Sequence, residues 1–210
     1  MSRRIDYYFT LTSPWAYIGH RPFMDLARRR GVSIVYRPVA LNEVFAETGG
    51  LPLPKRHPAR QAYRMMELQR WREKRGLPFR LKPKHWPFEA DPANRAVLAI
   101  AGAGGDPGAF VQSAFSAIWE QDEDLADPRT LQRLLSASGH DAEAVVSTAD
   151  SPKVRATYEQ NRLDAITAGV FGSPSYVLDE EVFWGQDRLD LLEDALTSGR
   201  RAYGPTPAGR

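Results

Sequence analysis

Cysteine is absent from this chain of 210 residues. The absence excludes disulfide bonds, metal sites built on thiolates and redox chemistry by thiols of the protein itself. The four histidines are His20, His57, His85 and His140, and their spacing is not that of metal ligands. We therefore expect no metal site.

A large net charge and long apolar segments are missing as well. The 28 Lys and Arg nearly balance the 26 Asp and Glu, and the net charge of +2 does not suggest a nucleic-acid-binding protein. No segment approaches the ~20 apolar residues that a membrane-spanning helix requires, and the first residues lack the apolar stretch of a signal peptide. With 42% hydrophobic and 26% charged residues, the composition is typical of a globular protein. We expect it in the cytoplasm, without nucleic-acid or membrane partners.

The positive charge is concentrated in one segment. Between Lys55 and Lys84, eleven Lys or Arg and two acids give a local charge of +9, which leaves −7 for the other residues. A solvated basic helix is the usual explanation of such a segment. A surface that faces an anionic small molecule is the second interpretation. Nucleic-acid binding ranks last because few aromatic residues lie between the charges.

Four short segments have the composition of β-strands. Residues 5–10 and 32–37 are rich in aromatic and β-branched residues, and Pro38 is expected to end the second segment. Residues 176–178 and 182–184 are apolar and flank three acidic residues. This pattern predicts a β-hairpin near the carboxyl end.

The segment between these strands predicts helices. A capping side chain precedes a proline in four places, which are Asp91-Pro92, Asp106-Pro107, Asp127-Pro128 and Ser151-Pro152. An N-cap oxygen accepts hydrogen bonds from free amides, and proline fits the first helical position because it has no amide to leave unpaired. Phe110, Phe115 and Trp119 share one face at helical spacing. Another helix is expected over residues 14–30, and a frayed tail from Gly199.

The order of these elements indicates an α/β protein with a helical middle. Three motifs lie at the ends of the expected strands and helices. They are Thr12-Ser13-Pro14-Trp15-Ala16, Gly169-Val170-Phe171-Gly172-Ser173-Pro174-Ser175-Tyr176 and Phe183-Trp184-Gly185-Gln186-Asp187-Arg188-Leu189. Taken singly, each has a purely structural explanation: a helix cap, a loop proline, and a strand end before a helix. Together they are more specific.

In combination, the motifs resemble a group of thioredoxin-like proteins. The group includes bacterial disulfide oxidants, kappa-class glutathione transferases and 2-hydroxychromene-2-carboxylate isomerases, and the similarity to the isomerase family is greatest. It extends from Ile5 to about Leu196. The resemblance implies a thioredoxin-like fold with an inserted all-helical subdomain. The expected division is residues 1–42 and 169–198 for the thioredoxin-like domain, 43–168 for the inserted subdomain and 199–210 for the tail.

The resemblance also implies a site for glutathione. The disulfide oxidants have Cys-x-x-Cys where this chain has Ser13-Pro14-Trp15-Ala16. A helix N-terminus stabilises a thiolate, and in the resembling family the serine hydroxyl binds the sulfur of glutathione, so Ser13 is the expected catalytic residue. Pro174 is expected to be cis and to face Ser13. Ser173 would then bind the cysteinyl unit through its backbone. Gln186 and Asp187, with Arg188 as a further candidate, would bind the γ-glutamyl end.

One position departs from the family pattern. The family commonly has an asparagine that contacts ligand where this chain has Gly50. Glycine has no side chain to donate a hydrogen bond, so one contact with glutathione or substrate is in question. Lys55 and Arg56 follow closely and are candidates to bind a substrate carboxylate, although exposed cations are at least as common an explanation. Trp15 is the expected aromatic contact, with packing in the core as the alternative.

The sequence leaves three candidate functions, of which two are enzymes and one is a non-catalytic binding protein. The first is a glutathione-dependent 2-hydroxychromene-2-carboxylate isomerase of aromatic-compound catabolism, in which reversible thiolate addition permits cis–trans isomerisation of a small anionic aromatic substrate. The second is a transferase similar to the kappa class. The third is a non-catalytic binding module on a thioredoxin-like fold. The family resemblance further implies a homodimer.

Overall fold

The computed structural model describes residues 3–204. The elements are β1 (Arg4–Phe9), α1 (Pro14–Arg30), β2 (Ser33–Pro38), α2 (Leu41–Thr48), η1 (Leu53–Lys55), α3 (Pro58–Lys74), α4 (Asp91–Gly102), α5 (Gly108–Trp119), α6 (Pro128–Ala137), α7 (Ala142–Ala149), α8 (Pro152–Thr167), β3 (Ser175–Leu178), β4 (Glu181–Trp184), η2 (Gln186–Arg188) and α9 (Leu189–Thr197). Among these described elements, no helix is both long and apolar enough to cross a bilayer.

The four strands form one sheet in the order β2-β1-β3-β4. Strands β1 and β2 are parallel, with Tyr7 opposite Tyr36, whereas β3 runs antiparallel to both β1 and β4. Asp179 and Glu180 connect β3 to β4 with positive φ angles of 50° and 69°, as a two-residue hairpin turn requires. The predicted hairpin is confirmed. The parallel pair also requires the crossover helix α1.

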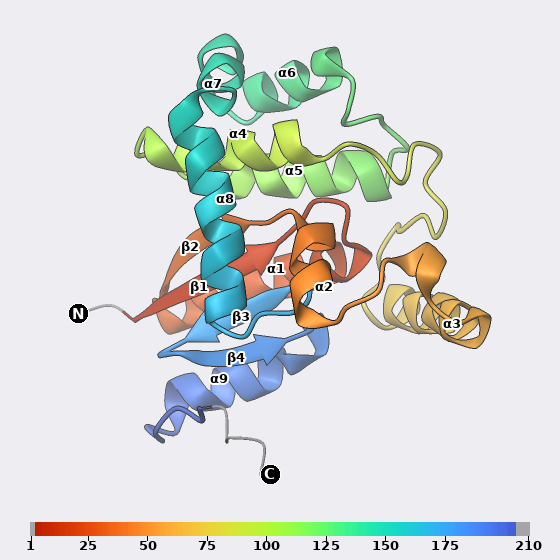
Figure 1. The fold of residues 1–210 in the computed structure, drawn as a ribbon, viewed down its shortest axis with the longest axis vertical. Helices are drawn as coiled ribbons and strands as arrows, with labels where there is room; N and C mark the ends of the chain where they lie inside the picture. Colours follow the sequence, from red (N-terminus) through yellow and green to blue (C-terminus); the bar gives the residue numbers. More distant parts are fainter. Residues whose placement is uncertain (1–2, 205–210) are drawn as a thin grey trace.

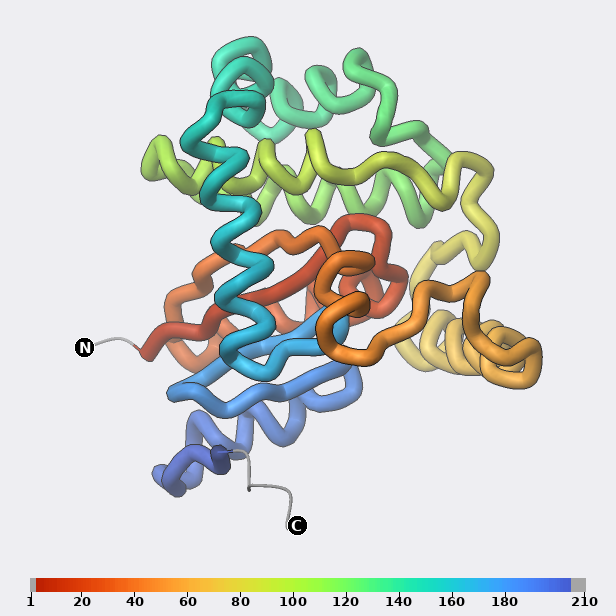
Figure 2. Tube along the Cα trace, viewed as in Figure 1, coloured from red at the N-terminus to blue at the C-terminus, as the bar shows by residue number. Residues whose placement is uncertain are grey.

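Helices cover both faces of the sheet (Figure 1). Alternate residues of a strand point to opposite faces: Tyr7 stacks on Tyr176 at 5.5 Å between ring centroids, whereas Tyr8 and Val177 pack with Ala165 of α8. Helices α4 to α7 form a layer at the top of the view in Figure 2, whereas α3 (gold) lies below this layer, at the right. One hydrophobic core includes buried residues from the sheet, α1 and these helices. The α/β thioredoxin-like fold with an inserted helical region is therefore confirmed.

The predicted helix starts are correct to within about one residue. Asp127 and Ser151 are N-caps, and their side chains accept hydrogen bonds from Arg129 and Val154 amides. Asp91 is instead the first residue of α4, after Ala90. Asp106 accepts from the amide of Gly108, where α5 begins. Relative to the predicted caps, α4 therefore begins one residue earlier and α5 one residue later.

The segment predicted to fray makes contacts as far as Tyr203, and residues 205–210 lie outside the described part of the chain. Arg200 donates two hydrogen bonds to the carboxylate of Glu181, at 2.7 and 2.9 Å. The Tyr203 amide donates to the same carboxylate at 3.0 Å, and the Arg200 guanidinium lies 4.3 Å from the Tyr203 ring centroid. These contacts hold Arg200 and Tyr203 against β4, a partner that cannot be recognised from the tail's own sequence.

A buried histidine of α1 makes the fold sensitive to acid. His20 is 1% exposed, and burial, with a smaller effect of the Arg21 charge, lowers its pKa to about 3. An unfolded chain protonates this histidine near pH 6.5, so the stability that His20 provides is complete above that pH and falls as the pH drops toward 3. We expect the free energy of unfolding to fall by about 2 kcal/mol between pH 6.5 and 5 through this residue.

This acid sensitivity is measured by urea unfolding of the wild type and His20→Gln at several pH values. The wild-type curve should be steeper between pH 6.5 and 5, because the variant has no imidazole to protonate on unfolding. Parallel curves for the two proteins would show that His20 does not cause the acid sensitivity.

Candidate active site

The first component of the site is the amino end of α1. Ser13 is its N-cap, and Pro14 occupies the first helical position. The Ser13 hydroxyl oxygen accepts a hydrogen bond from the Ala16 amide at 3.2 Å and donates one to the Ser173 carbonyl at 3.0 Å. Ser13 is 6% exposed. The sequence therefore places a hydroxyl at the positive end of a helix, where a sulfur anion is favoured.

The second component is the loop before β3. The Ser173–Pro174 peptide bond is cis, as predicted, and Ser173 faces Ser13. The Ser173 hydroxyl accepts from the Thr10 amide at 3.1 Å, which fixes its side chain. Within residues 3–204, the Ser173 amide donates to no acceptor. A backbone amide and a carbonyl bonded only to a rotatable hydroxyl are both available to an extended ligand.

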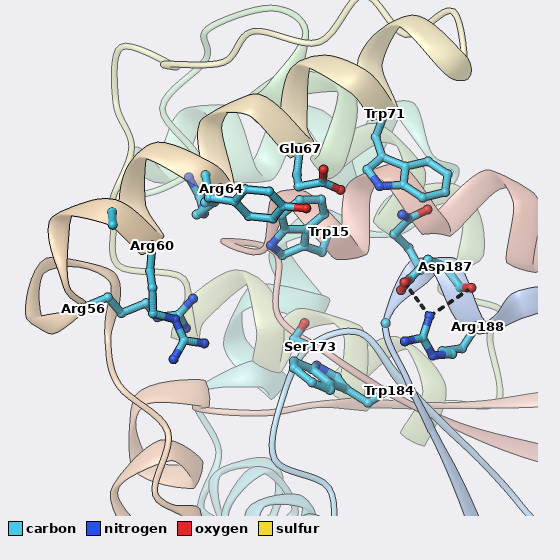
Figure 3. Close-up of a pocket in the computed structure, with 14 residues that line it drawn as sticks. Trp15, Arg56, Arg60, Arg64, Glu67, Trp71, Ser173, Trp184, Asp187 and Arg188 are labelled. Atoms are coloured by element: carbon cyan, nitrogen blue, oxygen red, sulfur yellow. Dashed lines mark hydrogen bonds and ion pairs between the residues drawn. The ribbon is translucent and has the colours of Figure 1, made fainter.

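A cavity of about 540 Å³ lies between α3, the Ser173 loop and the segment after β4 (Figure 3). This volume is typical of small-molecule sites. Its lining combines aromatic rings with charged groups, and consists of Trp15, Arg56, Ala59, Arg60, Tyr63, Arg64, Glu67, Trp71, Ser173, Trp184, Gly185, Gln186, Asp187 and Arg188.

One end of the cavity carries a negative and a positive side chain next to each other. Asp187 and Arg188 form an ion pair at 2.5 Å, drawn as dashed lines in Figure 3. Gln186 is 2% exposed, and its side-chain oxygen accepts from Arg75 at 3.1 Å. The Gly185 amide donates to the Pro174 carbonyl at 2.9 Å. This bond fixes the position of the segment 185–188 relative to the Ser173 loop.

The opposite end of the cavity is cationic. Arg56, Arg60 and Arg64 line it, and no carboxylate among residues 3–204 forms an ion pair with any of them. Burial and the Arg56 charge lower the pKa of Arg64 to about 10. Burial, followed by Arg60, lowers the pKa of Arg56 as well. Three guanidinium groups that repel each other, without a carboxylate partner in the described part of the chain, favour an anionic ligand.

Arg56 is held in place by the segment that departs from the family pattern. Its Nε donates to the Leu51 carbonyl at 2.7 Å, and its guanidinium lies 5.8 Å from the Phe45 ring centroid. A Cβ atom on Gly50 would lie 2.2 Å from Cδ1 of Phe45. Gly50 is therefore the residue that fits, because the Phe45 ring occupies the space that a side chain would need. Arg56 provides hydrogen-bond donors near this position instead.

The structure brings together most of the predicted site residues. Trp15, Ser173, Gln186, Asp187 and Arg56 all line one cavity, and Ser13 is linked to it through the hydrogen bond to Ser173. Lys55 is different: it is exposed and does not line the cavity. A 3₁₀ turn precedes α3 at this point, so adjacent side chains leave the backbone in different directions.

Besides Ala59, five residues of α3 that line the cavity were missed as site residues: Arg60, Tyr63, Arg64, Glu67 and Trp71. Their spacing of three, four, seven and eleven residues from Arg60 places them on one face of a helix. This spacing was a signal that could have found them within the basic segment. Glu67 is paired with Arg70, whose hydrogen bond lowers the pKa of that carboxyl.

The sheet, its crossover helix and the serine that caps α1 define a thioredoxin-fold protein with a cavity of small-molecule size, and residues 4–197 match the family of DSBA-like thioredoxin domains. The chain belongs to this family and, within it, to the family of 2-hydroxychromene-2-carboxylate isomerases. It is 34% identical to the enzyme of that name from Sphingobium xenophagum, over 93% of this chain and 99% of the relative.

Two further comparisons agree with this placement. A solved structure of a 2-hydroxychromene-2-carboxylate isomerase superposes with a TM-score of 0.77 at 25% identity, covering 93% of this chain and 95% of the other. Glutathione S-transferase kappa 1 of Caenorhabditis elegans is 26% identical over 92% of this chain and 90% of its own length.

Proposed function

We propose that this protein is a glutathione-dependent isomerase of 2-hydroxychromene-2-carboxylate or a closely related anionic aromatic compound. The observation that carries the proposal is the Ser13 hydroxyl, which caps α1 and faces the Ser173 loop beside an aromatic and cationic cavity. The names of the similar isomerases supply the substrate class. A cytoplasmic location and a homodimer are part of the same proposal.

The residues present fit glutathione. The Ser173 amide and carbonyl can form the pair of backbone hydrogen bonds that an extended cysteinyl unit requires. The Asp187 carboxylate suits an ammonium group and Arg188 suits a carboxylate, which are the two charges of a γ-glutamyl unit. The Ser13 hydroxyl, now bonded to the Ser173 carbonyl, can rotate toward a sulfur anion when a peptide amide takes that carbonyl.

Glutathione, when bound, would supply a sulfur nucleophile that adds reversibly to a conjugated double bond. Ser13 and the first amides of α1 stabilise negative charge at this position, because the hydroxyl donates and the helix end carries partial positive charge. Trp15, Tyr63 and Trp184 offer ring surfaces for an aromatic substrate. The arginines bind its carboxylate. No net oxidation is required, in agreement with a chain that has no cysteine.

The test is an absorbance assay of 2-hydroxychromene-2-carboxylate with and without glutathione. We expect isomerisation that requires glutathione, and an increase in the melting temperature with glutathione concentration, because a ligand of the native state stabilises it by mass action. Absence of both effects would favour the non-catalytic binding module and contradict the proposal.

The transferase alternative is supported by the kappa-class relative. It is separated from the isomerase by analysis of the products formed from one conjugated substrate. An isomerase returns free glutathione and the rearranged substrate, whereas a transferase yields a stable thioether. A stable thioether as the main product would replace our proposal with the alternative.

The cationic end of the cavity gives a prediction about substrate affinity. Replacing Arg64 by glutamine should raise the KM for the anionic substrate about tenfold, because a charge-assisted hydrogen bond contributes roughly 1.5–3 kcal/mol. Arg72→Gln is the matched control, since Arg72 lies on the same helix and does not line the cavity. Steady-state kinetics measures both. Equal KM values for Arg64→Gln and the wild type would exclude this role for Arg64.

A further inference from the structure

The loop that carries Ser13 is held by a buried side chain from the helical region. Asn94 of α4 accepts a hydrogen bond from the Leu11 amide at 3.3 Å through its Oδ1. Its Nδ2 donates to the Thr10 hydroxyl at 3.3 Å. Asn94 is 1% exposed, and it is separated from this loop by more than 80 residues of sequence. One amide group thus fixes two successive residues at the end of β1.

A second residue orients the Asn94 amide. Its Nδ2 also donates to the Tyr158 hydroxyl at 3.1 Å, and Tyr158 donates to the Asp91 carboxylate at 2.8 Å. Tyr158 lies on α8 and is 7% exposed. Because the two hydrogens and the oxygen of the Asn94 amide all have partners, its side chain has one favoured orientation.

Thr10, in the loop that Asn94 holds, is hydrogen-bonded to both Ser13 and Ser173. The Thr10 carbonyl accepts from the Ser13 amide at 3.0 Å, and the Thr10 amide donates to the Ser173 hydroxyl at 3.1 Å. Ser13 and Ser173 are themselves joined at 3.0 Å. Thr10 is therefore bonded to both serines, and Asn94 is bonded to Thr10. Movement of this loop would change the distance between the Ser13 hydroxyl and the Ser173 backbone.

We propose that Asn94 is a positioning residue that sets the place of the Ser13 hydroxyl relative to the Ser173 backbone. Asn94 does not line the cavity and acts through Thr10 and Leu11. Its effect on a bound sulfur rests on the proposed function, whereas its effect on the loop does not. The inserted helices thereby contribute to the site as well as to the core.

The first measurement is amide hydrogen exchange by NMR in Asn94→Leu, a replacement of similar size without hydrogen-bonding groups. The Leu11 and Ala16 amides should exchange at least tenfold faster, because one loses its acceptor and the other donates to the displaced Ser13 oxygen. Amides of β3 should keep their rates. A uniform acceleration throughout the chain, or unchanged rates at Leu11 and Ala16, would overturn the proposal.

The second measurement is the thiol pKa of bound glutathione, followed by thiolate absorbance near 240 nm. Asn94→Leu should raise this pKa by about one unit, a tenfold weaker preference for the thiolate. Asn161→Leu is the matched control: Asn161 is another buried asparagine, bonded to the Pro38 carbonyl, and its loss should reduce stability without changing the thiol pKa.

The outcomes separate the two proposals. If wild-type protein binds no glutathione, the proposed function fails, and the exchange rates alone decide the role of Asn94. If glutathione binds and Asn94→Leu exchanges faster in the loop without any change in thiol pKa, the positioning role is wrong. Should Asn94→Leu fail to fold, Tyr158→Phe serves both measurements. It removes one of the three partners of the Asn94 amide, together with the hydrogen bond from Tyr158 to Asp91, and should give smaller shifts in the same direction.

Discussion

Replacing Ser13 by alanine should lower kcat/KM for glutathione-dependent isomerisation about 100-fold, the usual effect of removing one donor that stabilises developing negative charge. In the structure the Ser13 hydroxyl donates a hydrogen bond to the Ser173 carbonyl at 3.0 Å. The thiol pKa of bound glutathione should rise as well. Steady-state kinetics and the pH–rate profile measure the effect.

The same substitution removes a helix cap, so its effect on stability needs a matched control. Ser13 accepts from Ala16 as Ser151 accepts from Val154. Either serine replaced by alanine should lose about 1 kcal/mol of unfolding free energy. Only Ser13→Ala should lose activity, since Ser151 caps α8 and does not line the cavity. Wild-type kinetics in Ser13→Ala would refute the catalytic role of this residue.

Replacing Trp119 by alanine should reduce the free energy of unfolding by about 4 kcal/mol, the range found when a buried tryptophan is truncated. Trp119 is 2% exposed. Its ring lies 5.6 Å from that of Phe79 and 6.2 Å from that of Trp86, measured between centroids. Its Nε1 donates to the Leu11 carbonyl at 3.3 Å. Urea unfolding measures the change.

Two further variants separate packing from hydrogen bonding at this position. Trp119→Phe keeps an aromatic ring and leaves the Leu11 carbonyl without its donor, so a loss of about 1 kcal/mol is expected from the hydrogen bond. Trp184→Ala removes a tryptophan that is 51% exposed and should change stability by less than about 1 kcal/mol. A similarly small loss in Trp119→Ala would show that the helical layer does not depend on this ring.

Local patterns in the sequence were sufficient to predict α1, whose N-cap is Ser13, and the β-hairpin. Ser13-Pro14 predicts the start of α1 because a cap and a proline act on adjacent amides, and the helix runs from Pro14 to Arg30. The apolar pairs around the acidic turn predict the hairpin for a similar reason. The identity of Gln186 and Asp187 as cavity residues followed from the family resemblance.

Contacts between distant segments were not predictable in the same way. Phe110, Phe115 and Trp119 share a helix face, but the sequence does not show that this face meets the loop before Ser13. Arg200 and Glu181 are paired across β4 and the tail, although neither segment by itself indicates a partner. The difference between Lys55 and Arg56 likewise depends on the direction of a single turn and on the Phe45 ring.

By itself, then, the sequence determined the strands and the capped helices, which depend on hydrogen bonds and side-chain periodicity within a few residues. The thioredoxin-like class and the serine in place of a thiol followed from the family resemblance of its motifs. Only the tertiary structure decided that α3 supplies one wall of the cavity, that three arginines there have no carboxylate partner among residues 3–204, and that Asn94 holds the loop of Ser13. Those relations depend on how helices pack across the sheet, and packing is fixed by all contacting surfaces together.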